Sequence, residues 1–251
     1  DLAVHSAKDM PVSLPEGLVI SALSEREDPG DVLILPKTAL KTDKKELVIG
    51  TSSPRRQLQI REQWHSICGS TKWLDKESRP VCVTLRGNVQ TRLKKLKEGA
   101  CDGILLAAAG LKRLGIEEGE EWRFIRLSPE QFLPAGGQGI LAVETKADTE
   151  AHRLCSQIDC RSSRLCLTAE RSVLETLQAG CHAPVAVYAN LFEEDGETKL
   201  RLRGINGPEH ASQLTDAELK NKIRRVDLCG TLSEISVTTL ADQAGKGLLW
   251  P

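Results

Sequence analysis

Lys8 and Asp9 stand side by side near the start of the chain, in the run His5-Ser6-Ala7-Lys8-Asp9-Met10-Pro11. A short apolar run at residues 2–4 precedes the pair, and Pro11 cannot continue a regular strand, so we expect the pair at a strand's end. A neighbouring lysine favours the ionised carboxylate, and such a carboxylate can stabilise a positive charge that develops on a substrate. The same pattern is typical of a solvated surface ion pair, so both interpretations stand.

A second group of chemically active side chains lies in Thr51-Ser52-Ser53-Pro54-Arg55-Arg56-Gln57. Ser53 is suited to cap a helix and Pro54 to begin it, which places backbone N–H groups beside two guanidinium groups. Helix N-termini and planar arginine side chains both bind carboxylates or phosphates. The motif therefore predicts either a pocket for an acidic small molecule or an ordinary capped helix with exposed arginines.

The same succession of strand, turn and helix follows twice more. A strand expected over residues 81–85 precedes the turn Arg86-Gly87-Asn88 and a helix that carries Arg92, and a buried-type strand over 103–107 precedes a small-residue turn and Arg113. Because parallel strands end at a common edge of a sheet, arginines at three consecutive junctions can converge on one cleft. An oligoanion or a polycarboxylate is the ligand that such a cleft would take.

Cys181 follows a long helical pattern over residues 148–179, which breaks into two pieces near 159–163. Gly180 is a natural C-terminal cap for the second piece, so we expect Cys181 on a loop. A thiol beyond a helix C-terminus lacks the dipole that lowers the cysteine pKa at helix N-termini, so Cys181 suits covalent attachment better than turnover as a nucleophile. A half-buried loop cysteine is the alternative.

The elements that must position these groups indicate an α/β protein. Further strands are expected over residues 18–23, 32–35 and 46–50. The turn Gly136-Gly137-Gln138-Gly139 leads into a strand rather than a helix, which argues against a dinucleotide site and favours close backbone approach or a chain crossing between domains. A small C-terminal α/β domain is expected from a hairpin across Asp195-Gly196, a strand near 223–228 and a helix near 238–244.

Composition limits the class of protein. With 251 residues, 40% of them hydrophobic, the chain can bury the cores of one large or two to three small domains. We expect a soluble, unexported protein, because the chain has no apolar run long enough to cross a bilayer and no basic-then-apolar leader. A net charge of -1 and 3% aromatic residues argue against a nucleic-acid binder.

The eight cysteines are expected as reduced thiols, because the chain is larger than typical disulfide-rich secreted domains. A zinc site could be read from Cys155, Cys160, Cys166 and Cys181 with His152 and His182. Their spacings contain no C-x-x-C pair, and part of the set falls in helical sequence. Scattered core cysteines are therefore the preferred interpretation.

Jointly, the motifs resemble the porphobilinogen deaminase family, also called hydroxymethylbilane synthase. The resemblance is carried, in the family's order and over nearly the whole chain, by residues 5–9, 51–57, 86–92, 109–113, 134–139 and 170–181. It implies an α/β fold of two periplasmic-binding-protein-like domains, the first truncated, and a small α/β C-terminal domain. The implied boundaries are 1–25 and 138–157 for the first domain, 26–137 for the second, and 158–251 for the domain that carries the cofactor.

The resemblance also implies an activity, namely stepwise condensation of four porphobilinogens with loss of ammonia to give hydroxymethylbilane. A dipyrromethane cofactor would be attached through Cys181, and Asp9 would assist departure of the amino group and stabilise the cationic azafulvene. The implied cofactor-binding residues, besides Cys181, are Lys8, Ser53, Arg55, Arg56, Arg86 and Gly87. The implied substrate-binding residues are Ser6, Thr51, Arg92, Arg113 and Gln138. No metal is implied, and we expect a cytoplasmic monomer without nucleic-acid or membrane partners.

Three departures from the family's pattern bear on these expectations. The chain has Ala179-Gly180-Cys181 where the family has Gly-Gly-Cys, and Pro54 where leucine is usual. It also begins inside the family's first domain, so we expect the opening part of that domain to be missing. A truncated, catalytically silent anion-binding protein is therefore the alternative function, and a nucleic-acid binder is a third.

Overall fold

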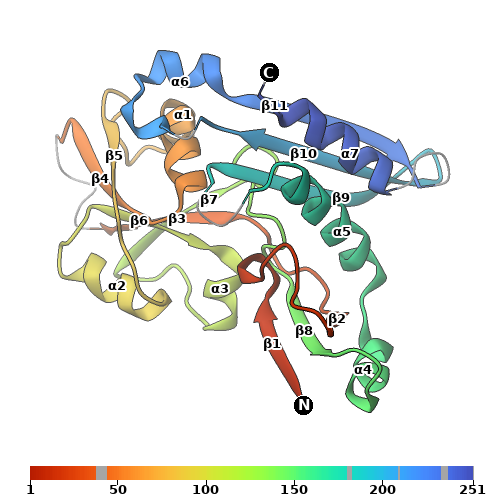
Figure 1. The fold of residues 1–251 in the computed structure, drawn as a ribbon. Helices are drawn as coiled ribbons and strands as arrows, with labels where there is room; N and C mark the ends of the chain where they lie inside the picture. The colour runs from red at the N-terminus through yellow and green to blue at the C-terminus, as the bar shows by residue number, and fades with distance from the viewer. Residues whose placement is uncertain (38–43, 180–182, 209, 233–236, 251) are drawn as a thin grey trace. The chain divides into compact units, whose positions relative to one another are not determined.

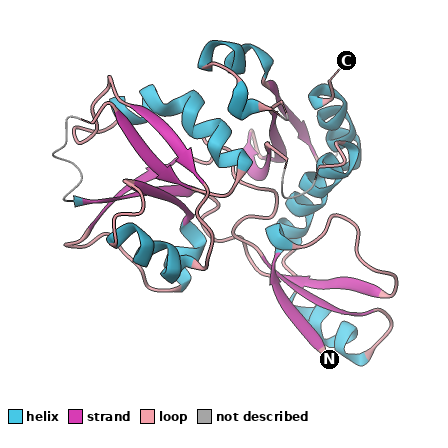
Figure 2. Ribbon diagram, turned by 60° about the vertical axis from the view of Figure 1, so that its left-hand side comes forward, coloured by secondary structure: helices cyan, strands magenta, loops and turns pink. Residues whose placement is uncertain are grey.

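The computed structural model describes residues 1–37, 44–179, 183–208, 210–232 and 237–250. They form two compact units, each assembled from segments that are distant in sequence (Figure 1). The first unit comprises residues 1–29, 133–206 and 224–251, and the second comprises residues 30–132 and 207–223. Both units contain sheets and helices (Figure 2), which confirms the α/β class expected from the sequence.

The second unit is built on a five-stranded mixed sheet in the order β5-β4-β6-β3-β7. Its strands are β3 (Asp31–Pro36), β4 (Glu46–Gly50), β5 (Arg79–Val83), β6 (Gly103–Ala107) and β7 (Trp122–Leu127). β4 pairs in parallel with both β5 and β6, whereas β3 runs antiparallel to β6 and β7. β3 and β6 are buried over nearly their whole length, which explains their continuous apolar sequences.

Helices cover both faces of this sheet. They are α1 (Pro54–Gly69), α2 (Val89–Lys97) and α3 (Ala108–Arg113), and the short α6 (Asp216–Lys222) packs against α1. Leu33 of β3 packs in one cluster with Trp64 of α1, and its neighbour Ile34 packs in another with Leu96 of α2 and Leu111 of α3. Because successive strand residues point to opposite faces, α1 lies on one face of the sheet and α2 and α3 lie on the other.

The segment 207–223, which connects the last two strands of the chain, belongs to the second unit. It contains the 3-10 turn η4 (Ala211–Gln213) and α6. Arg61 of α1 donates hydrogen bonds to the carbonyl oxygens of Ala211 and Leu214, both at 2.7 Å, and to Asp216 at 2.8 Å. One arginine therefore holds most of the segment against α1.

The first unit contains two antiparallel three-stranded sheets. One has the order β1-β8-β2, with β1 (Leu2–Ser6), β2 (Leu18–Leu23) and β8 (Leu141–Lys146), and it is followed by α4 (Glu150–Cys155) and η3 (Ser156–Ile158). The other has the order β11-β10-β9, with β9 (Val185–Glu194), β10 (Glu197–Asn206) and β11 (Arg224–Thr231). Asp195 and Gly196, both at positive φ, make the tight turn between β9 and β10 that the sequence predicts.

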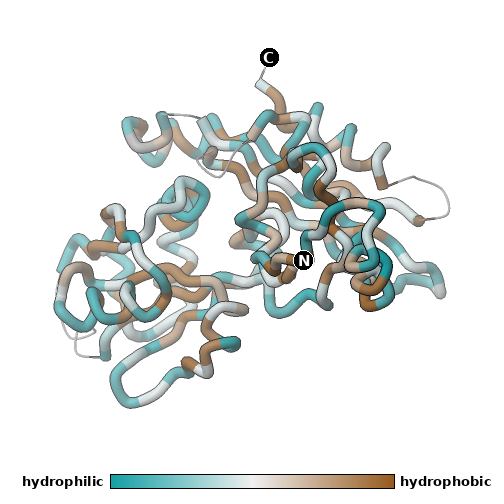
Figure 3. Tube along the Cα trace, turned by 60° about the horizontal axis from the view of Figure 1, so that its bottom comes forward, coloured by the Kyte–Doolittle hydropathy of each residue, from teal (hydrophilic) through white to brown (hydrophobic). Residues whose placement is uncertain are grey.

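Two helices, α5 (Arg161–Thr176) and α7 (Val237–Leu248), pack on one face of the second of these sheets (Figure 1). The alternate residues Val185, Val187 and Ala189 of β9 share a hydrophobic cluster with residues of both helices. Along the chain, hydrophobic stretches alternate with hydrophilic turns (Figure 3). The small C-terminal α/β fold predicted from the sequence is thus confirmed, while the division of the chain into three domains stays a prediction.

Three predicted boundaries differ from the structure. β5 begins at Arg79 rather than at residue 81, because it is an edge strand and Pro80 need not donate to a ladder there. α5 ends at Thr176, before the predicted cap at Gly180, because Gln178 adopts the left-handed conformation itself, with φ 50°. α7 reaches Leu248 rather than residue 244, because the buried apolar face continues to that residue.

Candidate functional site

Most of the predicted anion-binding residues lie at one edge of the five-stranded sheet, namely the edge at which the parallel strands β4, β5 and β6 end. Because β4, β5 and β6 are parallel, the chain leaves all three strands at this edge, at Thr51, Thr84 and Ala108. The common edge predicted for the three junctions is therefore confirmed. β3 runs the other way, so its first residue, Asp31, also lies at this edge, paired with Ala107.

The junction after β4 is built as a capped helix start. The Ser53 side chain accepts a hydrogen bond from the backbone N–H of Arg56 at 3.4 Å, and Pro54 begins α1, as the sequence predicts. Thr51 is buried, and its hydroxyl accepts from the backbone N–H of Ser53 at 3.2 Å. The Gln57 amide donates to the Thr51 carbonyl at 3.3 Å. These bonds hold the turn that presents the first N–H groups of α1.

The two arginines of this junction are buried around a carboxylate. Arg55 and Arg56 are 4% and 6% exposed, and Asp31 between them is 1% exposed. Asp31 accepts from Arg55 Nη1 on Oδ2 and from Arg56 Nη2 on Oδ1, both at 2.7 Å. Arg56 Nη1 also donates to the carbonyl of Leu105 at 2.9 Å. We call these three side chains the Asp31 cluster; two guanidinium groups and one carboxylate give it one net positive charge.

The two arginines of the Asp31 cluster favour the ionised form of its carboxyl group. Burial would raise the pKa of the Asp31 carboxyl, but the charges and hydrogen bonds of Arg55 and Arg56 outweigh burial and hold that pKa well below its usual range. Burial also lowers the pKa of the Arg55 guanidinium, and Asp31 opposes that shift. Asp31 is a residue of this edge that was not predicted from the sequence. The available signal was an acid at the first position of an apolar strand, where a buried charge requires a partner.

The junction after β5 brings Arg86, Gly87 and Arg92 together. Gly87 has φ +125°, a conformation that favours glycine, and its carbonyl accepts from Arg92 Nε at 2.8 Å. Lys95 Nζ donates to the Arg86 carbonyl at 3.1 Å. The Arg86 side chain is exposed at the turn, and Arg113 is exposed on the last turn of α3. Arg92 therefore uses one of its donors to hold the turn that presents Arg86.

In the first unit, Lys8 and Asp9 lie in the 3-10 turn η1 (Ala7–Asp9), directly after β1, so the predicted strand end is confirmed. Lys8 Nζ donates to Oε1 of Gln138 at 3.4 Å. Gln138 is buried, and its amide nitrogen donates to the carbonyl of Pro29 at 2.6 Å. The Asp9 side chain is exposed beside this anchored lysine.

The glycine-rich turn before β8 lies against η1. Gly137 has φ +76°, and a Cβ placed there would lie 3.0 Å from the backbone of Ala7. Gly139 has φ +92°, and a Cβ there would collide with the carbonyl oxygen of Glu27. The predicted role of these glycines, close backbone approach, is confirmed.

A buried ion pair anchors the same turn from α5. Glu170 accepts hydrogen bonds from the backbone N–H groups of Gly137 at 2.7 Å and Ala189 at 2.8 Å, and from Arg26 Nη2 at 2.8 Å. Burial raises the pKa of Glu170, while Arg26 and the two N–H donors oppose that shift. The Arg26 guanidinium lies 5.6 Å from the centre of the Tyr188 ring. We call this arrangement the Glu170 anchor.

The predicted site residues that the structure describes lie in two groups, one in each unit. The first group comprises Ser6, Lys8, Asp9 and Gln138, and the second comprises Thr51, Ser53, Arg55, Arg56, Arg86, Gly87 and Arg92, with Arg113 at the same sheet edge. Cys181, predicted as the covalent attachment point, lies outside the described residues.

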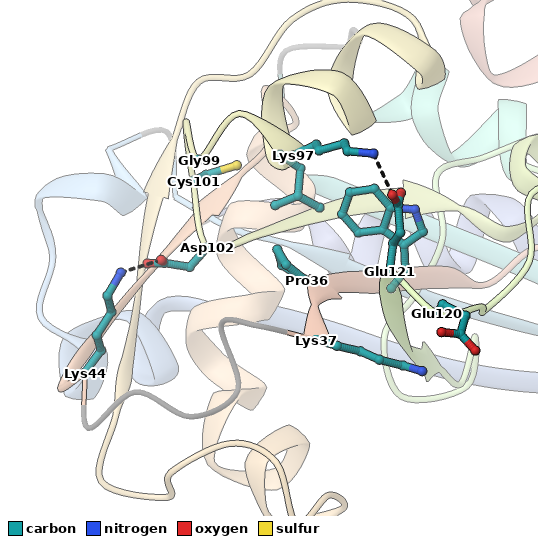
Figure 4. A pocket seen from close by; sticks show the side chains of 11 residues that line it. Pro36, Lys37, Lys44, Lys97, Gly99, Cys101, Asp102, Glu120 and Glu121 are labelled. Atoms are coloured by element: carbon teal, nitrogen blue, oxygen red, sulfur yellow. Dashed lines mark hydrogen bonds and ion pairs between the residues drawn. The ribbon is translucent and has the colours of Figure 1, made fainter.

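A hollow of about 570 Å³ lies at the opposite edge of the five-stranded sheet (Figure 4). Its lining includes two ion pairs, Lys97 with Glu121 at 2.5 Å and Lys44 with Asp102 at 2.7 Å. None of the predicted site residues is among the described residues that line it. This hollow is therefore separate from the sheet edge that carries the arginines.

The described residues contain no cluster of three or more histidine, cysteine and acidic side chains that could hold a metal ion. Seven cysteines are described, and all are free thiols. Burial raises the pKa of the Cys82 thiol to about 11, and burial with the nearby Glu170 charge raises that of Cys166 to about 11. Within the same described residues, no helix has the length and apolar character needed to cross a membrane.

Fold and site together define an α/β protein that has a sheet edge rich in arginines in one unit and an exposed carboxylate on a glycine-anchored turn in the other. Residues 1–153 match the family model of the porphobilinogen deaminase dipyrromethane cofactor binding domain, and residues 164–234 match that of the porphobilinogen deaminase C-terminal domain. The first match alone covers more than half of the chain. This chain belongs to the porphobilinogen deaminase family, which consists of transferases.

Curated relatives agree with this assignment. A porphobilinogen deaminase of Coxiella burnetii (strain Dugway 5J108-111) is 41% identical over 228 residues, which cover 85% of this chain and 68% of the relative. Porphobilinogen deaminase 1 of Streptomyces coelicolor is 41% identical over 219 residues, covering 85% of this chain and 64% of the relative. A porphobilinogen deaminase of Brevibacillus brevis is 40% identical over 258 residues, covering 99% and 74%.

Solved structures are much more distant. A periplasmic sulfonate-binding protein of Methylobacillus flagellatus matches with 16% identity and a TM-score of 0.26, over 62% of this chain and 41% of that one. YhfZ of Shigella flexneri matches with 15% identity and a TM-score of 0.27, over 72% and 70%. The family assignment therefore rests on the sequence matches.

Proposed function

We propose that this protein condenses four porphobilinogen molecules stepwise, with loss of ammonia, to give hydroxymethylbilane for haem biosynthesis. The observation that carries the proposal is the match of residues 1–153 to the family's cofactor-binding domain. The charge at the sheet edge is consistent with it, because porphobilinogen carries carboxylate side chains and the Asp31 cluster has one net positive charge beside the N-terminus of α1. None of these observations favours a catalytically silent anion-binding protein.

The residues at this edge suit a dipyrromethane that bears carboxylates, because guanidinium groups, backbone N–H groups and a hydroxyl are the donors that carboxylates accept from. In this proposal the cofactor is bonded to Cys181 and held by Lys8, Ser53, Arg55, Arg56, Arg86 and Gly87. When bound, it supplies the pyrrole carbon to which the first substrate pyrrole is joined. Arg86 is exposed for this contact, and Gly87 gives the turn its conformation.

The proposed substrate-binding residues are Ser6, Thr51, Arg92, Arg113 and Gln138. Two of these, Thr51 and Gln138, are buried, and we propose that they serve substrate binding through Ser53 and Lys8, to which they are hydrogen-bonded. Arg92 holds the Arg86 turn through its Nε, and a guanidinium group is a donor that suits a carboxylate.

Asp9 is the proposed catalytic carboxylate. When the aminomethyl C–N bond of porphobilinogen breaks, its electron pair leaves with the nitrogen, and positive charge develops on the pyrrole. The exposed Asp9 carboxylate, held by η1 and the glycine-rich turn, would bind the protonated aminomethyl group and stabilise the pyrrole cation that remains when this group leaves as ammonia. Ammonia is the leaving group of this step.

Replacing Asp9 tests this role directly. Asp9→Asn keeps the shape of the side chain but removes its charge, so turnover of porphobilinogen should fall by about 10²-fold or more. Glu16→Gln, which changes an exposed acid in a turn of the same unit, is the matched control and should keep the wild-type rate. An Asp9→Asn rate within a few-fold of wild type would overturn the assignment.

We further propose that the protein works as a cytoplasmic monomer on this small-molecule substrate, without a nucleic-acid or membrane partner. The free thiols of the seven described cysteines suit a reducing compartment, and a net charge of -1 suits a small-molecule enzyme better than a nucleic-acid binder. Light scattering of the purified protein at several concentrations tests the monomer, and a mass that doubles with concentration would contradict it.

A further inference from the structure

Asp31 occupies an unusual position for an acid in a site that binds anions. It begins β3 at the sheet edge of the proposed site and is 1% exposed. Its two oxygens divide between two partners, with Oδ2 bonded to Arg55 and Oδ1 bonded to Arg56 through both Nε and Nη2. Arg56 is held by a further hydrogen bond, which its Nη1 donates to the carbonyl of Leu105.

Stability alone does not account for this arrangement. Buried ion pairs are often no more stabilising than apolar residues of similar volume, because the charges must be removed from water. A purely structural role could therefore be filled by an apolar side chain on β3, where the following residues Val32, Leu33 and Ile34 are all fully buried. Two cations and an acid are instead held together where the chain leaves three parallel strands.

We propose that Asp31 is a positioning residue for the carboxylate-binding site, acting through Arg55 and Arg56. The proposal rests on the proposed function, in which these arginines bind the carboxylates of the pyrroles. By accepting from both guanidinium groups, Asp31 fixes their planes before a ligand arrives, so that binding loses less side-chain freedom. It also reduces the charge of the pair to one positive unit.

These two effects of Asp31 have opposite signs, which makes the proposal testable. Asp31→Asn raises the net charge of the cluster from one to two, so electrostatic attraction alone would strengthen the binding of an anionic substrate. Loss of the fixed geometry would weaken it. We therefore expect the variant to bind porphobilinogen less tightly despite its greater positive charge, with KM raised about tenfold and kcat changed much less.

The experiment compares wild type with five variants by steady-state kinetics and by calorimetric binding of porphobilinogen, the latter requiring no turnover. Asp31→Asn removes the charge. Asp31→Glu keeps the charge but displaces the carboxylate, and it remains informative even where the asparagine variant folds poorly. Asp102→Asn is the matched control in the same unit, because its carboxylate bonds the Val48 N–H and Lys44 near the opposite sheet edge. The remaining two variants carry Arg55→Gln and Arg56→Gln, one with Asp31→Asn and one without it.

Both Asp31 variants should weaken porphobilinogen binding, and Asp102→Asn should leave it unchanged. Once both arginines are replaced, Asp31→Asn should cause no further loss of porphobilinogen affinity. Wild-type affinity in folded Asp31→Glu, or an equal loss with and without the arginines, would overturn the proposal. Its failure is distinguishable from failure of the proposed function. Wild-type turnover with binding independent of Asp31 overturns only this inference, whereas binding that depends on Asp31 without any turnover overturns only the function.

Discussion

The Asp31 cluster and the Glu170 anchor are both buried acid–arginine arrangements, but they differ in what surrounds the carboxylate. Asp31 accepts from two guanidinium groups, and its pKa is held far below the usual range. Glu170 accepts from one guanidinium and two backbone N–H groups, and burial keeps its pKa above the usual range. The two guanidinium groups beside Asp31 outweigh its burial, whereas burial outweighs the single guanidinium group and the two N–H donors beside Glu170.

This difference matches the positions of the two groups. The Asp31 cluster lies at the edge proposed to bind carboxylates, where its net positive charge is useful. The Glu170 anchor has no net charge and ties backbone segments together, namely the glycine-rich turn, β9 and the Arg26 segment. One arrangement is suited to presenting charge and the other to holding the chain that supports Asp9.

The largest expected effect is on the Asp31 cluster. Asp31→Asn removes the carboxylate to which both buried guanidinium groups donate, and breaking a buried ion pair on one side costs about 3–5 kcal/mol. Urea unfolding of the variant should show this loss in the transition of the second unit. A loss below about 1 kcal/mol would mean that the arginines find other partners, and the contrast between the two arrangements would then fail.

A smaller effect is expected at the Glu170 anchor. Glu170→Gln keeps one oxygen acceptor but turns an amide N–H₂ toward one of the donors, at a cost of about 2 kcal/mol. The loss is smaller than at Asp31 because burial already penalises the charged form of Glu170. The same urea experiment measures it, with Glu16→Gln as the exposed control. A loss larger than that of Asp31→Asn would reverse the comparison.

The smallest effect is the dependence of these two losses on pH. The pKa of Asp31 is lowered by folding, so its contribution is present above the unfolded-state pKa of about 3.9 and is lost as the pH falls toward the folded value. The pKa of Glu170 is raised by folding, so its contribution is fully present below about 4.3 and is lost as the pH rises through the folded value.

Between pH 7 and pH 3, the destabilisation by Asp31→Asn should therefore shrink, and that by Glu170→Gln should grow. The change for Asp31→Asn should amount to about 1 kcal/mol over the window, since one pKa unit corresponds to about 1.4 kcal/mol, and the change for Glu170→Gln should have the opposite sign. Unfolding free energies of both variants and wild type at matched ionic strength provide the measurement. Parallel slopes for the two variants would show that the surroundings of the two carboxylates do not differ as described.

Local sequence signals predicted the elements of this comparison but not its contacts. Ser53 and Pro54 mark the start of α1, and Asp195-Gly196 marks a hairpin, because capping and turn conformations depend on a few adjacent residues. The common sheet edge also followed from the order of strands and helices. These features determine where the backbone places Arg55 and Arg86, but not which groups their side chains contact.

The missed contacts join residues that are distant in sequence. Asp31 meets Arg56 across 25 positions, and Glu170 meets Arg26 across 144. The place of Asp31 at the start of an apolar strand indicates burial, but nothing local identifies the partners of either acid. The early end of α5 was missed for a different reason, because the left-handed conformation at Gln178 is uncommon outside glycine and asparagine.

The central claim is that this family member uses its arginine-bearing sheet edge and Cys181 to build a pyrrole chain. Intact mass spectrometry of the purified protein, before and after incubation with porphobilinogen, tests it most directly. We predict a covalent adduct of two pyrrole units that maps to Cys181, is absent from Cys181→Ser, and gains further pyrrole units when substrate is added. An unmodified mass under both conditions, in protein shown to be folded, would contradict the account.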